Sequence, residues 1–202
     1  LAVTGNYYYK DESYGSRSNS AFMPFDGFLG EGVDSVDYMR RFLEDGSSGV
    51  DLPAAVIVET VQGEGGVNVA SIEWLQKLAG LCREFDILLI VDDIQVGNGR
   101  TGTFFSFERA GIQPDMVTLS KSIGGGLPMA LLLMRPDLDQ WKPGEHTGTF
   151  RGNNLAFVAA TEALGYWDND DLSGAVAHKG EIIRSELERI AGRFPELGAS
   201  VR

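Results

Sequence analysis

Hydrophobic residues change from an irregular to a regular pattern near Pro53. The first 50 residues are rich in aromatic residues and glycine, and only Ser35 to Glu44 is predicted there as a helix. Beyond Pro53, short and continuous apolar runs are separated by helical patterns. Apolar runs of this kind are typical of strands buried on both faces. The predicted strands are Ala54–Glu59, Ile87–Val91, Met116–Leu119 and Ala130–Met134. The expected fold class is therefore α/β, with a mostly parallel sheet flanked by helices.

Three helices are predicted in this regular part. Ser71 is a suitable N-cap for a helix that runs to about Phe85, with apolar residues on one stripe. Two longer helices are expected at about Asn154 to Trp167 and Leu172 to Arg193. Because the chain opens on Leu1 and stops soon after the last helix, we expect it to be the middle of a longer protein.

Composition narrows the class of protein. A hydrophobic content of 43% and a charged content of 23% are ordinary for a globular protein. The net charge of −12 disfavours binding to nucleic acid or to anionic membranes, because both are polyanions. No apolar run reaches the roughly 18 residues of a membrane span, and no signal-like start is seen, so we expect a cytoplasmic location. The only cysteine, Cys82, is expected to be a small buried residue.

An amine and a carboxylate lie at the ends of two predicted strands. Lys121 follows the strand Met116-Val-Thr-Leu-Ser120 and precedes three glycines, and Asp92 and Asp93 follow Ile87-Leu-Leu-Ile-Val91. Pyridoxal phosphate chemistry needs such a pair, because an amine forms a Schiff base with the aldehyde and a carboxylate keeps the pyridine nitrogen protonated. At least one of the two aspartates should lie at a buried rim, where it needs a partner; spacing alone does not say which.

The carboxyl ends of the strands point to one shared site. Glu59, Asp92, Gln95 and Lys121 all lie at or just past a predicted strand end. In parallel sheets ligands bind at this edge. We therefore expect these four residues to belong to one site.

Several other patterns have competing interpretations. Gly97-Asn-Gly-Arg-Thr-Gly102 matches a dinucleotide fingerprint, but five residues separate it from the strand and a short aromatic segment follows it, which disfavours nucleotide binding. Glu59 and Glu64 would suit glycosidase chemistry only if they faced one cleft, which the sequence does not show. His146 is interpreted as a residue that organises its loop, with an acid or base role as the alternative. Neither Cys82 nor the two histidines have the spacing of metal ligands, so no metal is expected.

Five ordered motifs together resemble the class III, fold-type I pyridoxal-phosphate aminotransferases. They are Glu59-Thr-Val-Gln-Gly-Glu-Gly-Gly66, Ile90-Val-Asp-Asp-Ile-Gln95, Gly99-Arg-Thr-Gly102, Ser120-Lys-Ser-Ile-Gly-Gly-Gly126 and Gly148-Thr149. The resemblance implies the aspartate-aminotransferase-like large domain, without its N-terminal segment and C-terminal small domain. Residues 1–170 would be part of the cofactor-binding large domain, and residues 171–202 the start of the small domain.

The resemblance also implies roles for particular residues. Lys121 would be the Schiff-base lysine and the proton shuttle, and Asp92 would pair with the pyridinium nitrogen. Ile94 would pack on the ring face, and Gln95 would hydrogen-bond the ring 3′ oxygen. Thr149 resembles a threonine that contacts the phosphate of the neighbouring subunit's cofactor, which implies a homodimer or a higher homo-oligomer with shared sites.

Within the family, several segments resemble the branch that makes 2,4-diaminobutyrate for ectoine biosynthesis. They include Met23-Pro-Phe-Asp-Gly-Phe28, the Asp92-Asp93 pair, and the segment from Trp141 to Phe157. The resemblance implies that L-2,4-diaminobutyrate and 2-oxoglutarate exchange with L-aspartate 4-semialdehyde and L-glutamate. Glu59 would help to switch between amino donor and keto acid.

Three alternatives to this reaction stay open. The first is another omega-aminotransferase that uses ornithine, acetylornithine or 4-aminobutyrate. The second is a nucleotide-dependent oxidoreductase that uses the Gly97 to Gly102 loop. The third is a non-catalytic paralogue that keeps the sheet and does not bind the cofactor.

Overall fold

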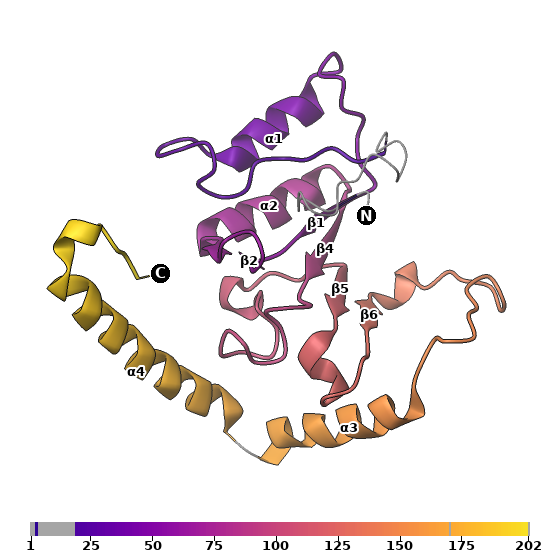
Figure 1. Cartoon of the computed structure of the whole chain (residues 1–202). Coiled ribbons are helices and arrows are strands. Elements are labelled where there is room, and N and C mark those ends of the chain that lie inside the picture. Colours follow the sequence, from indigo (N-terminus) through magenta and orange to yellow (C-terminus); the bar gives the residue numbers. More distant parts are fainter. Residues whose placement is uncertain (1–2, 4–18, 170, 202) are drawn as a thin grey trace, which may run out of the picture. The chain divides into compact units, whose positions relative to one another are not determined.

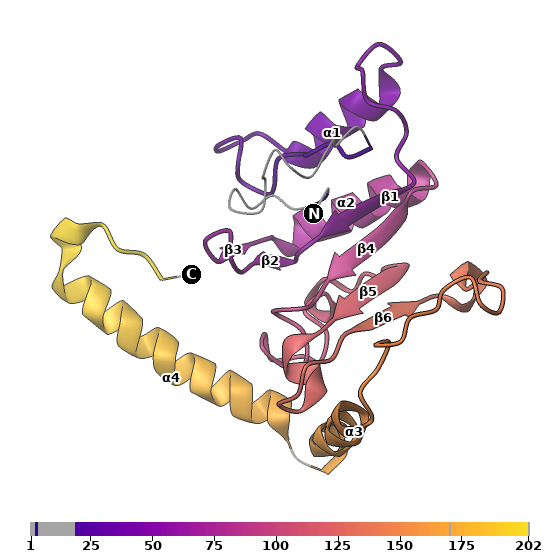
Figure 2. The same ribbon diagram turned by 45° about the vertical axis from the view of Figure 1, so that its right-hand side comes forward.

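Four strands form the main sheet of the computed structural model (Figure 1), which describes residues 3, 19–169 and 171–201. They are β1 (Ala55–Val58), β4 (Leu88–Asp92), β5 (Met116–Leu119) and β6 (Leu131–Met134), in the order β1-β4-β5-β6. The pairs β1/β4 and β4/β5 are both parallel, and Figure 2 shows the strands side by side. The predicted α/β fold class with a mainly parallel sheet is confirmed.

The chain forms two compact units. The first comprises Leu1–Asp92, Arg109–Thr118 and Leu132–Asp139, and therefore holds nearly all of the sheet. The second comprises Asp93–Glu108, Leu119–Leu131 and Gln140–Arg202. The first boundary between the two units therefore falls between Asp92 and Asp93.

Two helices accompany the sheet in the first unit. Helix α2 (Ile72–Glu84) contacts both β4 and helix α1 (Ser35–Glu44), and α1 and α2 lie side by side in Figure 1. Ser71 caps α2 as predicted, since its side chain accepts a hydrogen bond from the Trp74 N–H. The Trp74 indole donates to the Ser35 hydroxyl at 2.7 Å, and both side chains are buried. The core of this unit includes Val36, Leu75, Leu78, Ala79, Cys82, Leu89, Val91 and Val117.

A small hairpin follows β1 where the sequence predicts only a glycine loop. Strands β2 (Val61–Gln62) and β3 (Asn68–Val69) pair antiparallel. The Asn68 side chain donates to the Gln62 side chain at 3.1 Å and to the Gly65 carbonyl at 3.0 Å, so it closes the turn between them. Two residues a strand are too few to produce a recognisable period, which is why the pattern did not predict this hairpin.

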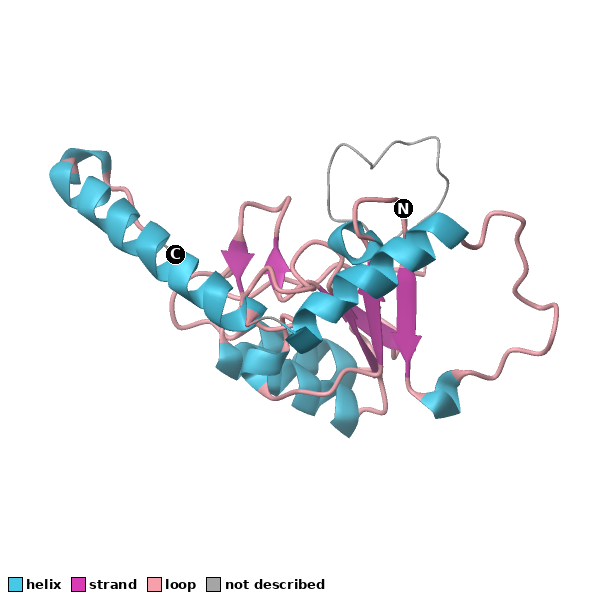
Figure 3. Ribbon diagram, turned by 90° about the horizontal axis from the view of Figure 1, so that it is seen from below, coloured by secondary structure: helices cyan, strands magenta, loops and turns pink. Residues whose placement is uncertain are grey.

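The second unit holds the two long C-terminal helices, drawn in cyan in Figure 3. Helix α3 spans Asn154–Asn169 and α4 spans Leu172–Arg193, the latter with the bounds that the sequence predicts. Short 3-10 helices are η3 (Glu108–Ala110), η4 (Lys121–Gly124), η5 (Pro136–Leu138) and η6 (Pro195–Leu197). No helix in the described ranges is long and apolar enough to cross a membrane. The domain boundary near residue 170 stays a prediction.

Candidate active site

Lys121 is held in an unusual backbone conformation. It is the first residue of η4 and has a φ of 52°, in the left-handed region that residues with a Cβ seldom adopt. Ser120, just before it, is extended, and its hydroxyl donates to the Met129 carbonyl at 2.7 Å. The Lys121 side chain is exposed. The chain therefore turns sharply at the end of β5 and exposes the amine. Strained backbone of this kind is common at functional sites.

The glycines after Lys121 allow η4 to lie against α3. Gly125 has a φ of 60°, and a Cβ at this position would lie 2.6 Å from the Ala159 carbonyl oxygen. A Cβ on Gly124 would lie 3.1 Å from the Met129 Cβ. Both glycines are thus needed for close packing around the lysine turn.

An open cavity of about 920 Å³ lies beside Lys121 within the second unit. Its other walls come from the segment Pro128–Ala130 and from the residues that lead into α3, Phe150 to Asn154, together with Phe157. Asn153 caps α3, because its side-chain oxygen accepts from the Leu155 N–H at 2.9 Å. The cavity therefore combines an amine with polar groups at the start of a helix, which suits an anionic or polar ligand.

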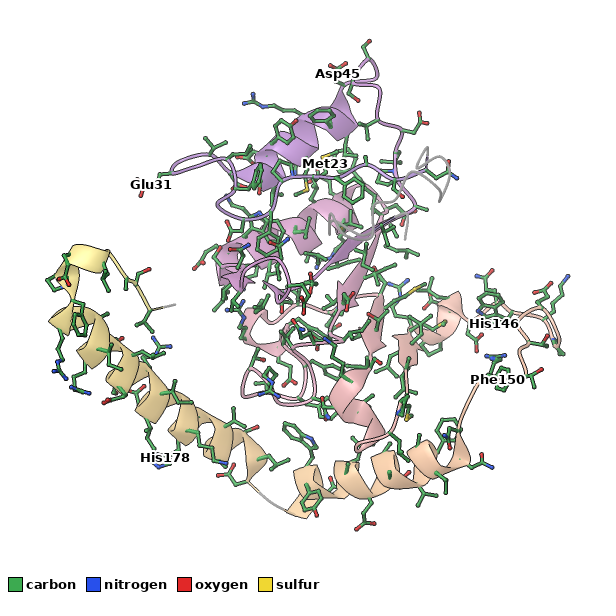
Figure 4. The ribbon with its side chains drawn as sticks, viewed as in Figure 1. Met23, Glu31, Asp45, His146, Phe150 and His178 are labelled. Carbon is green, nitrogen blue, oxygen red and sulfur yellow. The ribbon has the colours of Figure 1, made fainter. Side chains whose placement is uncertain are left out.

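His146 makes contacts with two other residues of the loop before α3. Figure 4 labels His146 and Phe150 on this loop. The Trp141 and His146 rings meet edge to face with centroids 5.0 Å apart, and the Arg151 guanidinium donates to the His146 carbonyl. These contacts agree with the loop-organising interpretation of His146. Thr149 lies on the same exposed loop, next to the cavity residue Phe150, and its role stays a prediction.

Asp92 and Glu59 belong to the first unit, at the ends of its parallel strands. Asp92 is the last residue of β4 and stands opposite Thr118 of β5 in the register. Glu59 directly follows β1. The Thr118 hydroxyl oxygen is buried and has no hydrogen-bond partner within the described part of the chain. A carboxylate and a buried, unsatisfied hydroxyl on neighbouring strands fit a polar ligand at this edge.

Asp93 is the aspartate that is fully buried. Its side chain is 1% exposed, and its two carboxylate oxygens accept hydrogen bonds from the Ser106 N–H, at 3.0 Å, and from the Ser106 hydroxyl. Asp92 is only partly buried. The second acid thus lies in the interior and the first is partly exposed, while the pairing of Asp92 with the ring nitrogen stays a prediction.

The glycine loop that resembles a dinucleotide fingerprint has a different structural basis. A Cβ on Gly97 would lie 2.8 Å from an Asp93 carboxylate oxygen, and one on Gly99 would lie 2.7 Å from the Trp167 ring. Gly102 has a φ of 102°. Turns and the three-residue helix η3 follow, not the long helix that binds a pyrophosphate. The expectation that this loop is not a nucleotide site agrees with its geometry.

The site residues fall in both units. Lys121, Ile94, Gln95 and Thr149 lie in the second unit, and Glu59 and Asp92 lie in the first. The pairing of the Lys121 amine with the Asp92 carboxylate at one cofactor therefore stays a prediction. The sequence did not predict that Ser120, Arg151 and Asn153 line the cavity, or that the Thr118 hydroxyl is buried without a partner among the described residues. Each lies in a segment that was interpreted through its other residues. No cluster of three or more metal-ligating side chains occurs among the residues that the structure describes.

The chain belongs to the class-III aminotransferases, whose family pattern matches residues 1–202. Pyridoxal phosphate is the cofactor that this family indicates. Among curated proteins, the chain is 67% identical over its full length to a diaminobutyrate–2-oxoglutarate transaminase of Wolinella succinogenes, of which it covers 47%. It is 57% identical to the enzyme of the same name from Virgibacillus pantothenticus, of which it covers 49%. The chain thus spans about half the length of these relatives.

Solved structures show the same fold. An ornithine aminotransferase of Toxoplasma gondii with partial occupancy of PLP at its active site is 37% identical, with a TM-score of 0.69 over 84% of this chain and 39% of that one. An (S)-enantioselective omega-transaminase of Thermomicrobium roseum is 31% identical, with a TM-score of 0.72 over 84% of this chain and 40% of that one. The expected PLP-transferase fold class is therefore confirmed.

Proposed function

We propose that the protein containing this chain transfers the terminal amine of L-2,4-diaminobutyrate to 2-oxoglutarate, giving L-aspartate 4-semialdehyde and L-glutamate. The observation that carries the proposal is the placement of Lys121, an exposed amine at a strained strand end beside an open cavity, in a chain 67% identical to a transaminase of that name. In the cell the direction that makes diaminobutyrate for ectoine is the one we favour. The proposed location is the cytoplasm.

Pyridoxal phosphate would be held by residues at or just past the ends of β4 and β5. Lys121 would bind its aldehyde carbon, Asp92 its ring nitrogen and Gln95 its 3′ oxygen, with Ile94 against the ring. The buried Thr118 hydroxyl opposite Asp92 supports a polar group at this edge, because such an atom is costly to leave unpaired. When bound, the cofactor withdraws electrons from the substrate carbon.

The chain supplies positioning and proton transfer. The Lys121 amine is exposed at the cavity, so once free it can carry a proton to and from a carbon held there. The Asp92 carboxylate would hold a proton on the ring nitrogen, since an anion beside that nitrogen favours its charged form. Glu59 would adjust the site for the amino donor or the keto acid.

A homodimer or higher homo-oligomer is part of the proposal. Thr149 lies on an exposed loop, and Phe150 beside it is 98% exposed, which is unusual for a large apolar side chain. A neighbouring subunit that covers this loop would receive Thr149 at its cofactor phosphate. The active sites would then be shared between subunits.

The test uses the full-length protein. We expect a visible band with pyridoxal phosphate, and borohydride reduction should leave a modified peptide that contains Lys121. Lys121→Ala should abolish turnover of diaminobutyrate with 2-oxoglutarate, and Lys179→Ala, which removes an exposed lysine on α4, should leave it unchanged. An active Lys121→Ala variant, or an adduct at another lysine, would refute the assignment.

A second candidate function is transamination of another omega-amine. The observation that favours it is the likeness to solved ornithine and acetylornithine aminotransferases, at 32–37% identity. Comparison of diaminobutyrate, ornithine, acetylornithine and 4-aminobutyrate as donors separates the two. A kcat/KM for ornithine above that for diaminobutyrate would favour the second.

A further inference from the structure

Asp93 is a buried acid to which the proposed reaction assigns no role. Its side chain is 1% exposed, and Ser106, its partner, is 0% exposed. The Ser106 N–H donates to one carboxylate oxygen at 3.0 Å, and the Ser106 hydroxyl donates to the other. Thirteen positions separate the two residues, so one side chain joins the two ends of a long loop.

Asp93 also fixes the first turn of this loop. The Gly97 N–H donates to the Asp93 carbonyl at 2.9 Å, and Gly97 packs so closely on the carboxylate that a Cβ there would meet it at 2.8 Å. Further along, the Asn98 N–H donates to the Phe104 carbonyl at 2.6 Å. The loop is thus closed twice, once at its base and once nearer its tip.

Gln95 lies inside the turn that Asp93 closes. It stands between Asp93 and Gly97, whose backbone groups are hydrogen-bonded to each other. Ile94 and Val96 occupy the positions on either side of it. A residue in so short a closed turn has little backbone freedom, so the orientation of Gln95 depends on the groups that hold Asp93.

We propose that Asp93 is a positioning residue, which acts with Ser106 to orient Gln95 for the cofactor. This inference rests on the proposed function, because Gln95 contacts the ring 3′ oxygen only if pyridoxal phosphate is bound. A carboxylate suits the role, since both of its oxygens accept, and both groups of Ser106 donate. Asparagine has the same shape, but it lacks the negative charge, and its NH₂ group would make the Ser106 hydroxyl accept rather than donate.

The test compares variants of the full-length protein. Asp93→Asn and Ser106→Ala should each raise the Kd for pyridoxal phosphate about tenfold and shift the pH midpoint of the bound cofactor's visible band, in the direction that Gln95→Ala shifts it. Asp93→Asn combined with Gln95→Ala should weaken binding no more than Gln95→Ala alone. Thr103→Ala is the matched control. It removes a hydroxyl that donates to the Phe105 carbonyl at 2.6 Å nearer the loop tip, and it should move neither readout.

A purely structural role for Asp93 predicts a different result. Asp93→Asn would then lower Tm without changing the band, and its effect on cofactor binding would add to that of Gln95→Ala. Either finding overturns the proposal. A wild-type protein with no visible band would instead refute the proposed function, so the two failures can be told apart.

Discussion

Leu89 and Asp115 exchange two hydrogen bonds. The Leu89 N–H donates to an Asp115 carboxylate oxygen at 2.7 Å, and the Asp115 N–H donates to the Leu89 carbonyl at 2.8 Å. Arg135 adds an ion pair, with Nη1 2.7 Å from the other carboxylate oxygen. One side chain therefore joins β4, the start of β5 and the end of β6. This junction lies at the end of the sheet where β4 and β5 begin, opposite the end at which Asp92 lies.

Asp115→Ala should destabilise the first unit, because the Leu89 N–H loses its acceptor inside the sheet. A buried donor left unpaired costs about 1–3 kcal/mol of unfolding free energy. Arg135→Gln is the control: its side chain is 52% exposed, so its removal should have a smaller effect. Urea unfolding measures both, and equal losses would show that the ion pair, rather than the bond to Leu89, stabilises this edge.

Gly99→Ala and Gly102→Ala should differ in unfolding free energy. Both glycines have positive φ, 90° and 102°, so an alanine at either position costs about 1 kcal/mol in backbone strain. Only at Gly99 would the new Cβ meet another group, the Trp167 ring at 2.7 Å, which should add about 1–3 kcal/mol. Thermal unfolding of the two variants checks this, and equal Tm values would contradict the contact.

Lys121→Gly should be more stable than Lys121→Ala, although neither should be active. The φ of 52° at this position strains any residue with a Cβ, and glycine relieves about 1 kcal/mol of that strain. Denaturation of the two variants without cofactor gives the difference directly. If alanine proves the more stable, the left-handed turn at Lys121 does not persist in solution.

Stability should fall at alkaline pH because of Cys82. Burial, with a smaller contribution from Asp115, raises the pKa of the Cys82 thiol from the ordinary 9.0 to about 11. The folded state therefore holds this proton more tightly than the unfolded state. The associated stability is complete below pH 9.0 and is lost as the pH rises to about 11. Cys82→Ala should lose less stability over this range, as urea midpoints would show; parallel curves would argue against the shift.

Strands and helices were predicted well from the sequence because each has several apolar residues at a regular spacing. The predicted strand Met116–Leu119 and the helix Leu172–Arg193 have the observed bounds, and the other strands shift by one residue at an end or both. The hairpin Val61–Val69 was missed because it depends on the Asn68 side chain rather than on a period.

The candidate site was predicted only as a set of residue types. Apolar strands followed by Asp92 and Lys121 predict a site at these strand ends, but no spacing distinguishes a buried Asp93 from a partly exposed Asp92. That distinction depends on Ser106, thirteen positions away, and a contact of this kind has no signature in one sequence. The left-handed turn at Lys121 was not predicted either, because a lysine in the sequence, unlike a glycine, does not indicate a positive φ.

The burial of Cys82 has a practical consequence for spectroscopy. The side chain is 2% exposed and is the only thiol of the chain, so maleimide reagents would find no native target in this segment while it is folded. A cysteine introduced on the loop between Asp93 and Ser106, for example in place of the exposed Arg100, would accept a fluorescent or spin label while Cys82 stays unlabelled. Within this segment no native thiol would therefore compete for a label placed on that loop.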